Sequence, residues 1–217
     1  MTERAPVHRT VVKVCGITRF EDANAALEAG ADWLGFVFYR ESPRRIEAEP
    51  AAQILAALPH ATGVLVMVSP EPEEALALAR RIGAKRLQLH RVEPAAWPHD
   101  FPLPITVSIP VGEDGQPQTE LPPRNDLLML DTADEILPGG TGRTFPWRGA
   151  AILAARRAVM LAGGLGPDNV AEALARVRPY GVDAASRLES APGIKDHERV
   201  RRFVAAVRAH DALRGAA

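Results

Sequence analysis

Two side chains in the sequence stand where they could transfer protons. Cys15 follows the mostly apolar run VVKV and precedes Gly16, and Asp131 follows four apolar residues in NDLLMLDT. A thiol gains reactivity when a helix N-terminus or a cation lowers its pKa. A carboxyl that loses part of its hydration has a higher pKa, which suits a general acid. Each residue also has a structural interpretation: Cys15 as a small buried apolar residue, and Asp131 as a helix-capping or loop carboxylate.

Other residues in the sequence could bind anions. Glycines let backbone N–H groups approach an anion without an intervening Cβ. Small-residue turns lie at 139–142 in LPGGTGRTFPW, at 163–164 after Leu161-Ala162, and at 185–186. Consecutive turns of this kind beside a helix N-terminus predict a phosphate site. Arg44, in FVFYRESPRRI, could hold a carboxylate through two parallel hydrogen bonds, although most loop arginines are simply solvated.

The candidate residues follow short apolar segments, which predict β-strands. We expect strands at 11–17, 33–38, 62–68, 86–90, 103–109, 126–130, 158–162 and 181–185. Alanine-rich segments of helical spacing predict helices at 21–29, 50–58, 73–82, 168–177 and 197–210. Thr18 and Glu21 have the spacing of a capping box, and Pro50 is expected as a first helical residue. Lys195-Asp196 is expected to cap the last helix.

Strands that alternate with helices predict a parallel sheet, because parallel neighbours need a crossover connection. Eight such units in 217 residues predict one (β/α)₈ barrel domain over residues 1–217, with residues 1–9 as a flexible N-terminal extension. An open doubly wound sheet is the alternative. The Pro-rich stretch 110–123 predicts a long irregular loop in place of the helix after strand five. In either architecture, ligands collect at the C-terminal ends of the strands.

Composition argues against several classes of function. The formal net charge is -1, so the chain lacks the basic excess typical of nucleic-acid and anionic-membrane binding. A single cysteine excludes an intrachain disulfide and a cysteine-based metal cluster, and the histidines lack ligand spacing. No stretch approaches the roughly 18 apolar residues that a membrane span needs. We therefore expect a cytoplasmic protein. Composition does not fix the oligomeric state, for which a monomer or a homodimer is expected.

The motifs, in this order, resemble phosphoribosylanthranilate isomerase, a barrel family of tryptophan biosynthesis. The matching stretches are KVCGIT (13–18), GADWLGFVFYRESPRRI (30–46), LQLH (87–90), LLMLDT (127–132), GGTGRTFPW (139–147), LAGGLGPDNV (161–170) and ESAPGIKD (189–196). They span nearly the whole chain. The combination of a cysteine after strand one, an aspartate after strand six and two glycine-rich motifs is far more specific than a lone glycine motif.

The resemblance implies an Amadori rearrangement of N-(5-phosphoribosyl)anthranilate, with no metal or cofactor. It implies Cys15 as general base, Asp131 as general acid and Arg44 as the partner of the anthranilate carboxylate. The substrate's phosphate would bind at Gly140, Thr141, Gly142, Gly163, Gly164, Ser186 and Arg187. Lys13, two residues before Cys15, shares its face of the strand and is expected to line the barrel interior near an anion. His90 is expected to make a structural hydrogen bond.

The sequence departs from the family pattern at three positions. Arg187 and Arg91 stand where the family usually has glycine, and Ser108 stands where strand five often carries lysine. If position 187 needs a positive φ, Arg187 adds strain of about 1 kcal/mol and crowds the phosphate. Otherwise its guanidinium binds the phosphate directly. Two further readings remain open: another phosphosugar isomerase, which would carry aspartate in place of Cys15, and a non-catalytic barrel that binds a phosphorylated metabolite.

Overall fold

The computed structural model describes residues 9–93, 96–98, 100–122, 126–132 and 144–216. Its strands are β1 (Val11–Cys15), β2 (Trp33–Val37), β3 (Thr62–Val68), β4 (Arg86–His90), β5 (Ile105–Val111), β6 (Leu127–Thr132), β7 (Val159–Leu161), β8 (Gly181–Ala184), β9 (Glu189–Ala191) and β10 (Ile194–Lys195). Its helices are α1 (Phe20–Glu28), α2 (Ala48–Ala57), α3 (Pro72–Ile82), α4 (Trp147–Ala154), α5 (Val170–Val177) and α6 (His197–Ala216), with a 3₁₀ turn, η2 (Ser186–Leu188).

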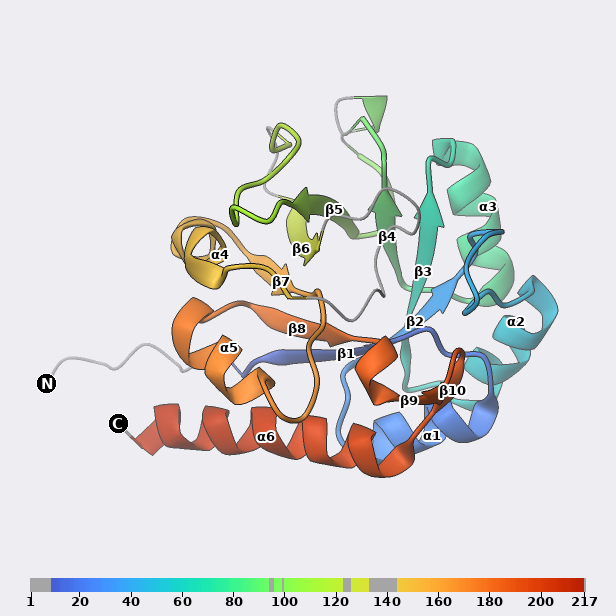
Figure 1. The fold of residues 1–217 in the computed structure, drawn as a ribbon. Helices are drawn as coiled ribbons and strands as arrows, with labels where there is room; N and C mark the ends of the chain where they lie inside the picture. Colours follow the sequence, from blue (N-terminus) through green and yellow to red (C-terminus); the bar gives the residue numbers. More distant parts are fainter. Residues whose placement is uncertain (1–8, 94–95, 99, 123–125, 133–143, 217) are drawn as a thin grey trace, which may run out of the picture.

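Strands β1 to β8 form a closed parallel barrel in sequence order, with the helices around it (Figure 1). Strand β1 pairs with both β2 and β8, which closes the ring. In this register Lys13 lies beside Asp183, and Cys15 lies beside Gly35. The expected (β/α)₈ barrel is therefore confirmed, and the open-sheet alternative is wrong.

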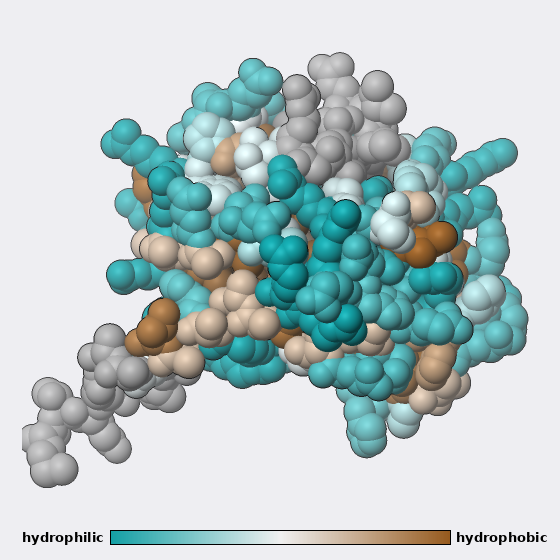
Figure 2. Space-filling model, turned by 60° about the horizontal axis from the view of Figure 1, so that its bottom comes forward, coloured by the Kyte–Doolittle hydropathy of each residue, from teal (hydrophilic) through white to brown (hydrophobic). Residues whose placement is uncertain are grey.

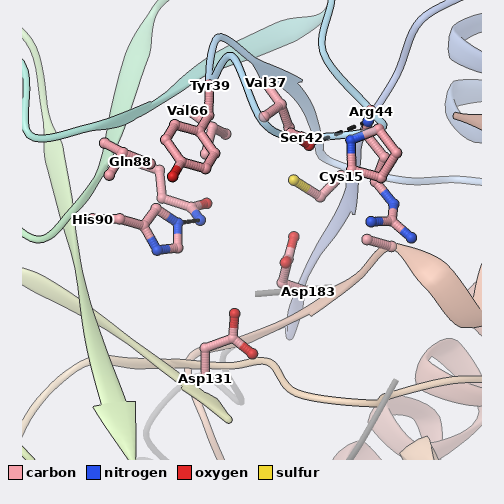
Figure 3. Close-up of a pocket in the computed structure, with 13 residues that line it drawn as sticks. Cys15, Val37, Tyr39, Ser42, Arg44, Val66, Gln88, His90, Asp131 and Asp183 are labelled. Atoms are coloured by element: carbon pink, nitrogen blue, oxygen red, sulfur yellow. Dashed lines mark hydrogen bonds between the residues drawn. The ribbon is translucent and has the colours of Figure 1, made fainter. Parts of the chain in front are cut away.

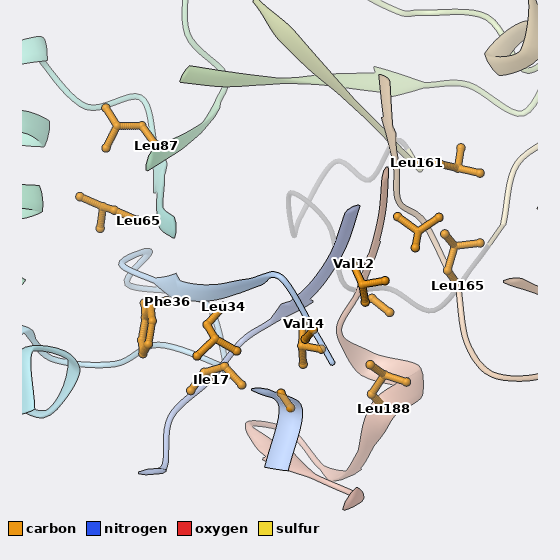
Figure 4. Packing of buried hydrophobic residues seen from close by; sticks show 14 of the residues in the cluster. Val12, Val14, Ile17, Leu34, Phe36, Leu65, Leu87, Leu161, Leu165 and Leu188 are labelled. Carbon is orange, nitrogen blue, oxygen red and sulfur yellow. The ribbon is translucent and has the colours of Figure 1, made fainter. Parts of the chain in front are cut away.

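Alternation along the strands separates two sets of buried residues. Val12 and Val14 of β1 point outward and pack with residues such as Leu34 and Phe36 of β2 in the layer between sheet and helices (Figure 4). Lys13 and Cys15 point inward, because successive side chains of a strand face opposite sides. Each strand therefore contributes side chains both to the layer between sheet and helices and to the interior of the barrel.

Helix α6 covers the closure of the barrel with one apolar face. Val200, Phe203, Val204 and Val207 are fully buried, at the spacing expected for one side of a helix. The face of the molecule that includes α6 is mainly hydrophilic, with apolar residues only in scattered patches (Figure 2). None of the helices in the described ranges combines the length and the apolar character needed to cross a bilayer.

The predicted elements match the observed ones apart from small boundary shifts and the corrections given below. Helix α1 begins after Arg19 with no side-chain cap, so the capping box is wrong: Thr18 Oγ1 donates instead to the carbonyl of Gly193. Helix α2 begins at Ala48, so Pro50 is not its first residue. Helix α4 has no counterpart among the helices that the sequence predicts, and α6 extends beyond residue 210.

The irregular loop after strand five is largely confirmed. Strand β5 continues to Val111, two residues into the predicted loop, and residues 112–122 contain no helix. Residues 123–125 and the N-terminal residues 1–8 lie outside the described part. Arg9, the last residue of the expected extension, forms an ion pair with Asp32.

A short hairpin, β9–β10, follows the last barrel strand and was not predicted. It lies beside α1 (Figure 1), and the backbone N–H of Lys195 donates to Asp22 Oδ2 at 3.0 Å. Asp196 then accepts hydrogen bonds from the N–H groups of Glu198 and Arg199 at 3.0 and 3.1 Å. The predicted capping role of Asp196 is thus confirmed, whereas the side chain of Lys195 is buried.

Candidate active site

A hollow opens at the C-terminal ends of the barrel strands. It is lined from β1, β2 and its loop, β3, β4, β6 and β8 by Cys15, Val37, Tyr39, Ser42, Pro43, Arg44, Val66, Val68, Gln88, His90, Asp131, Asp183 and Ala185. Figure 3 shows the Cys15 sulfur and the Asp131 carboxyl facing the open centre from different sides, with Asp183 between them in this view. The barrel thus brings three of the predicted residues, Cys15, Asp131 and Arg44, to one hollow.

The Cys15 thiol is buried next to a cation. Burial raises the pKa of this thiol above its ordinary value, and the Lys13 ammonium, which donates a hydrogen bond to it, only partly offsets that rise. Asp183 raises the pKa further, whereas Lys195 lowers it. Burial is therefore the main cause of the raised pKa of Cys15, and the neighbouring charges of Lys13, Asp183 and Lys195 adjust it.

Lys13 is held by an ion pair inside the barrel. Its Nζ lies 2.7 Å from Asp183 Oδ1, and both residues are more than nine-tenths buried. Burial alone lowers the pKa of Lys13, but Asp183 and Cys15 raise it above its ordinary value, so the amine stays protonated. The predicted inward position of Lys13 is confirmed. Asp183 also points inward, although the sequence does not determine on which side of its strand this side chain lies.

Asp131, the residue before the last in β6, lies at the junction of two hollows. It is buried, and its Oδ1 accepts the N–H of Thr132 at 2.8 Å. The adjoining hollow is lined by Asp131, Ala162, Gly163, Gly164, Leu165, Asp183, Ala184, Ala185 and Ser186. Gly163 must be glycine here, because its φ is +80° and a Cβ would lie 2.4 Å from Thr132 Oγ1.

The second hollow brings together three residues of the predicted phosphate site, whereas Arg187, the fourth that the structure describes, is not among its lining residues. Gly163, Gly164 and Ser186 come together there, beside Asp131. Gly140, Thr141 and Gly142 lie outside the described residues.

Arg44 carries a buried ion network that the sequence did not reveal. Its Nε donates to Glu189 Oε1 at 2.9 Å and Oε2 at 3.1 Å, and its Nη2 donates to Oε2 at 2.9 Å. Lys195 Nζ lies 2.8 Å from Glu189 Oε1. Burial lowers the pKa of Lys195, although Glu189 raises it. The sequence carries this network only in the motif ESAPGIKD, in which Lys195 is expected to cap a helix and not to form a buried ion pair.

His90 and Gln88 form a neutral wall of the main hollow. Gln88 Nε2 lies 2.8 Å from His90 Nε2, so the predicted structural hydrogen bond of His90 is confirmed. Burial, together with the positive charges of Lys13 and Arg91, lowers the pKa of His90 to about 3. His90 is therefore neutral near physiological pH. Within the described ranges, acidic, histidine and cysteine side chains form no group that could hold a metal ion.

Comparisons with known proteins agree with these motifs. The family model described as N-(5'-phosphoribosyl)anthranilate (PRA) isomerase matches residues 12–206. The chain belongs to this family. The N-(5'-phosphoribosyl)anthranilate isomerase of Pseudomonas fluorescens strain Pf0-1 is 42% identical over 199 residues, which are 90% of this chain and 97% of that protein. That of Rubrobacter xylanophilus is 45% identical over 204 residues, 91% of this chain and 98% of that protein.

Solved structures of phosphoribosylanthranilate isomerases share the fold. The crystal structure from Thermotoga maritima has a TM-score of 0.83 at 36% identity, and the match covers 92% of this chain and 99% of that one. A complex with reduced 1-(o-carboxyphenylamino)-1-deoxyribulose 5-phosphate has a TM-score of 0.79 at 33% identity, with the same coverage. Monomers generated from the dimeric Thermotoga maritima enzyme match with a TM-score of 0.77 at 32% identity, again with this coverage.

The departures from the phosphoribosylanthranilate isomerase pattern have different structural effects. Arg91 has φ +52°, a left-handed conformation that explains why glycine suits this position. Arg187 does not have a positive φ, so the condition for backbone strain at this position is not met. Its exposed side chain lies along Gly166, where a Cβ would be 3.0 Å from Arg187 Cβ. Ser108 is buried in β5 beside Met129 of β6.

The space for the thiol comes from Gly35 in β2. A Cβ at this position would lie 2.7 Å from Cys15 Sγ and 3.0 Å from Lys13 Nζ. Gly35→Ala should therefore lower the free energy of unfolding in urea by about 1–3 kcal/mol, the usual cost of overpacking. The cost should be smaller in the Cys15→Ala background, where the nearest contact is gone.

Gly215→Ala is the control, because a Cβ there meets nothing within 4 Å. It should leave stability unchanged or slightly raised, since alanine favours helix. An equal cost of Gly35→Ala with and without the thiol would show that Cys15 is not what limits this position.

Proposed function

We propose that this chain converts N-(5-phosphoribosyl)anthranilate to 1-(2-carboxyphenylamino)-1-deoxyribulose 5-phosphate, with Cys15 and Asp131 as the proton-transferring pair. The reaction is the Amadori rearrangement of tryptophan biosynthesis, the activity named for the family. These roles are supported by the shared hollow, because the thiol of Cys15 and the carboxyl of Asp131 both line it from different strands. A related enzyme has been solved with a reduced form of the product bound.

The first step opens the ribose ring. Asp131, in its protonated form, gives its proton to the ring oxygen while the anthranilate nitrogen forms a C=N bond at C1. The C1–O bond breaks, and its electrons remain on the oxygen that receives the proton. Asp131 stands at the junction of the two hollows, where a sugar would link the aromatic ring to the phosphate.

The second step removes the proton from C2. The iminium nitrogen makes this proton acidic, and the Cys15 thiolate takes it while the C2–H electrons form the enolamine. This intermediate then tautomerises to the ketose. The nitrogen accepts the electrons, so the chemistry calls for no metal or cofactor. Lys13 stabilises the thiolate, and the neutral His90 adds no charge that would oppose the iminium cation.

Two anionic groups of the substrate anchor it at opposite ends. In the proposal, Arg44 binds the anthranilate carboxylate, and the turns at Gly163-Gly164 and Ser186 bind the phosphate through backbone N–H groups. Gly140, Thr141 and Gly142 are proposed to complete the phosphate site. Arg187, exposed next to Gly166, adds a guanidinium at its edge.

The proposal also covers compartment and assembly. The cytoplasm is the proposed location, because a reducing compartment keeps the Cys15 thiol free. The chain is proposed to act as a monomer or homodimer; for the Thermotoga maritima enzyme, both a dimeric form and generated monomers are described. A phosphosugar isomerase with aspartate at position 15 and a non-catalytic barrel are disfavoured, because Cys15, Asp131 and Arg44 are present together.

Cys15→Ser and Asp131→Asn test the catalytic pair. Each should lower kcat by about 10² to 10⁴, with a smaller change in KM, because each removes one proton transfer. Loss of the anthranilate fluorescence reports turnover. Asp100→Asn, an exposed substitution before β5, should leave turnover unchanged. Near-normal turnover in either variant would remove that residue from the pair.

Lys13→Met and Asp183→Asn test the electrostatics of the thiol. Only the thiolate acts as base, so kcat/KM should rise with pH as Cys15 ionises. Removing the Lys13 ammonium raises the pKa of Cys15 and should move this rise to higher pH. Removing the Asp183 charge lowers that pKa and should move it to lower pH.

The measurement is the pH profile of kcat/KM for both variants. A shift of one pH unit corresponds to about 1.4 kcal/mol of interaction with the thiolate. Shifts in the same direction, or none, would mean that Cys15 is not the titrating base.

Arg187→Gly tests the phosphate assignment. If the guanidinium binds phosphate, KM should rise by about tenfold or more with kcat little changed, because a charge-assisted hydrogen bond is lost. Arg178→Gly makes the same substitution at the C-cap of α5, away from this turn, and should leave KM unchanged. A lower KM for Arg187→Gly would show that the arginine obstructs the site instead.

A further inference from the structure

Glu189 of the β9–β10 hairpin is buried against two cations at the edge of the hollow. It contacts Arg44 through three hydrogen bonds of 2.9 to 3.1 Å, and Lys195 Nζ lies 2.8 Å from its Oε1. The exposed fractions of the Arg44, Glu189 and Lys195 side chains are 11%, 4% and 0%. A carboxylate so placed fixes the orientation of the guanidinium.

We propose that Glu189, supported by Lys195, is a positioning residue that presents Arg44 to the carboxylate of the substrate. The inference rests on the proposed function, in which Arg44 binds this group. Glu189 takes the Nε and Nη2 donors of Arg44, whereas Nη1 makes no hydrogen bond to any residue of the described ranges. The donors left over are those that an incoming carboxylate can use.

The charge of the cluster suits an anionic ligand. Arg44 and Lys195 carry two positive charges against the one negative charge of Glu189, so this cluster keeps one excess positive charge. Lys13 and Asp183, the other buried ion pair of the hollow, balance each other. An arriving carboxylate would neutralise the excess, whereas a neutral aromatic ring would not.

The hairpin anchors Glu189 firmly. Its Oε1 also accepts the N–H of Gly193 at 3.3 Å, and its backbone carbonyl accepts Arg199 Nη1 at 2.6 Å. Lys195 Nζ also lies 3.3 Å from the carbonyl oxygen of Ala185, next to the last barrel strand. An arginine held by so fixed a partner loses little conformational freedom when the ligand binds.

The stem of Arg44 is also packed against the segment that carries the thiol. A Cβ on Gly16, the residue after Cys15, would lie 2.7 Å from Arg44 Cδ. Because of this contact, any change in the orientation of the Arg44 guanidinium takes place next to Cys15. Glu189 fixes the angle at which the ring of the substrate enters relative to Cys15.

The test compares two ligands of the purified protein. One is reduced 1-(o-carboxyphenylamino)-1-deoxyribulose 5-phosphate, and the other is the same molecule without its carboxyl group. Glu189→Gln should weaken binding of the carboxylated ligand by about ten- to a hundredfold, the usual range for a charge-assisted hydrogen bond. It should leave binding of the other ligand within about twofold. Equal weakening of both would mean a merely structural role, and tighter binding of the first would mean that Glu189 competes with it.

Three further variants serve as a control, as a conservative replacement of Glu189 and as a separate test of Arg44. Glu47→Gln removes the exposed partner of the neighbouring Arg45 and should change neither affinity. Glu189→Asp keeps the charge but withdraws it by one methylene, so it should discriminate between the ligands in the same sense if Glu189→Gln does not fold. Arg44→Gln should weaken only the carboxylated ligand. If Arg44→Gln fails to discriminate, the proposed role of Arg44 is wrong; if it discriminates and both Glu189 variants do not, only the positioning role is wrong.

Discussion

The pairing of the first barrel strand with the last is the constraint on which the site depends. Strand β1 lies parallel to β8 with Lys13 beside Asp183, and these side chains form an ion pair inside the barrel. A charge buried alone would be strongly unfavourable, so each residue needs the other in place. Shifting the pairing by one residue would turn one of the two side chains toward the helices and leave the other unpaired inside the barrel. The strand pairing that closes the ring therefore also fixes the charged residues next to the thiol.

Most of the barrel could be predicted from the sequence because its signals are local. Each strand is a short apolar run, and the order of strands in the ring follows the order in the chain. Helix starts were harder: Thr18 has the residue type of a cap, yet its hydroxyl bonds to Gly193 in the hairpin. The hairpin itself gave no periodic pattern, because it is held by ion pairs and hydrogen bonds with distant residues.

The candidate site was predictable where a residue stands at the end of a strand. Cys15 and Asp131 were identified in this way and Arg44 from the loop after the second strand, and all three line one hollow. Asp183 could not be placed, because the direction of a side chain depends on a register that sequence does not state. Glu189 and Lys195 were missed for a different reason: buried charges occur only where partners from remote segments neutralise them, and Arg44 precedes Glu189 by 145 residues.

The missing side chain at Gly35 limits how the barrel could acquire other chemistry. Sγ of Cys15 already fills the space beside this residue, since an added methyl would come within 2.7 Å of it. An aspartate at position 15 would place two further oxygen atoms in the same corner and a second carboxylate near Asp183. Replacing Cys15 by aspartate would therefore require further changes in the residues around position 15. Redesign toward a sugar isomerase of that type would have to begin with the neighbouring strand and the interior ion pair.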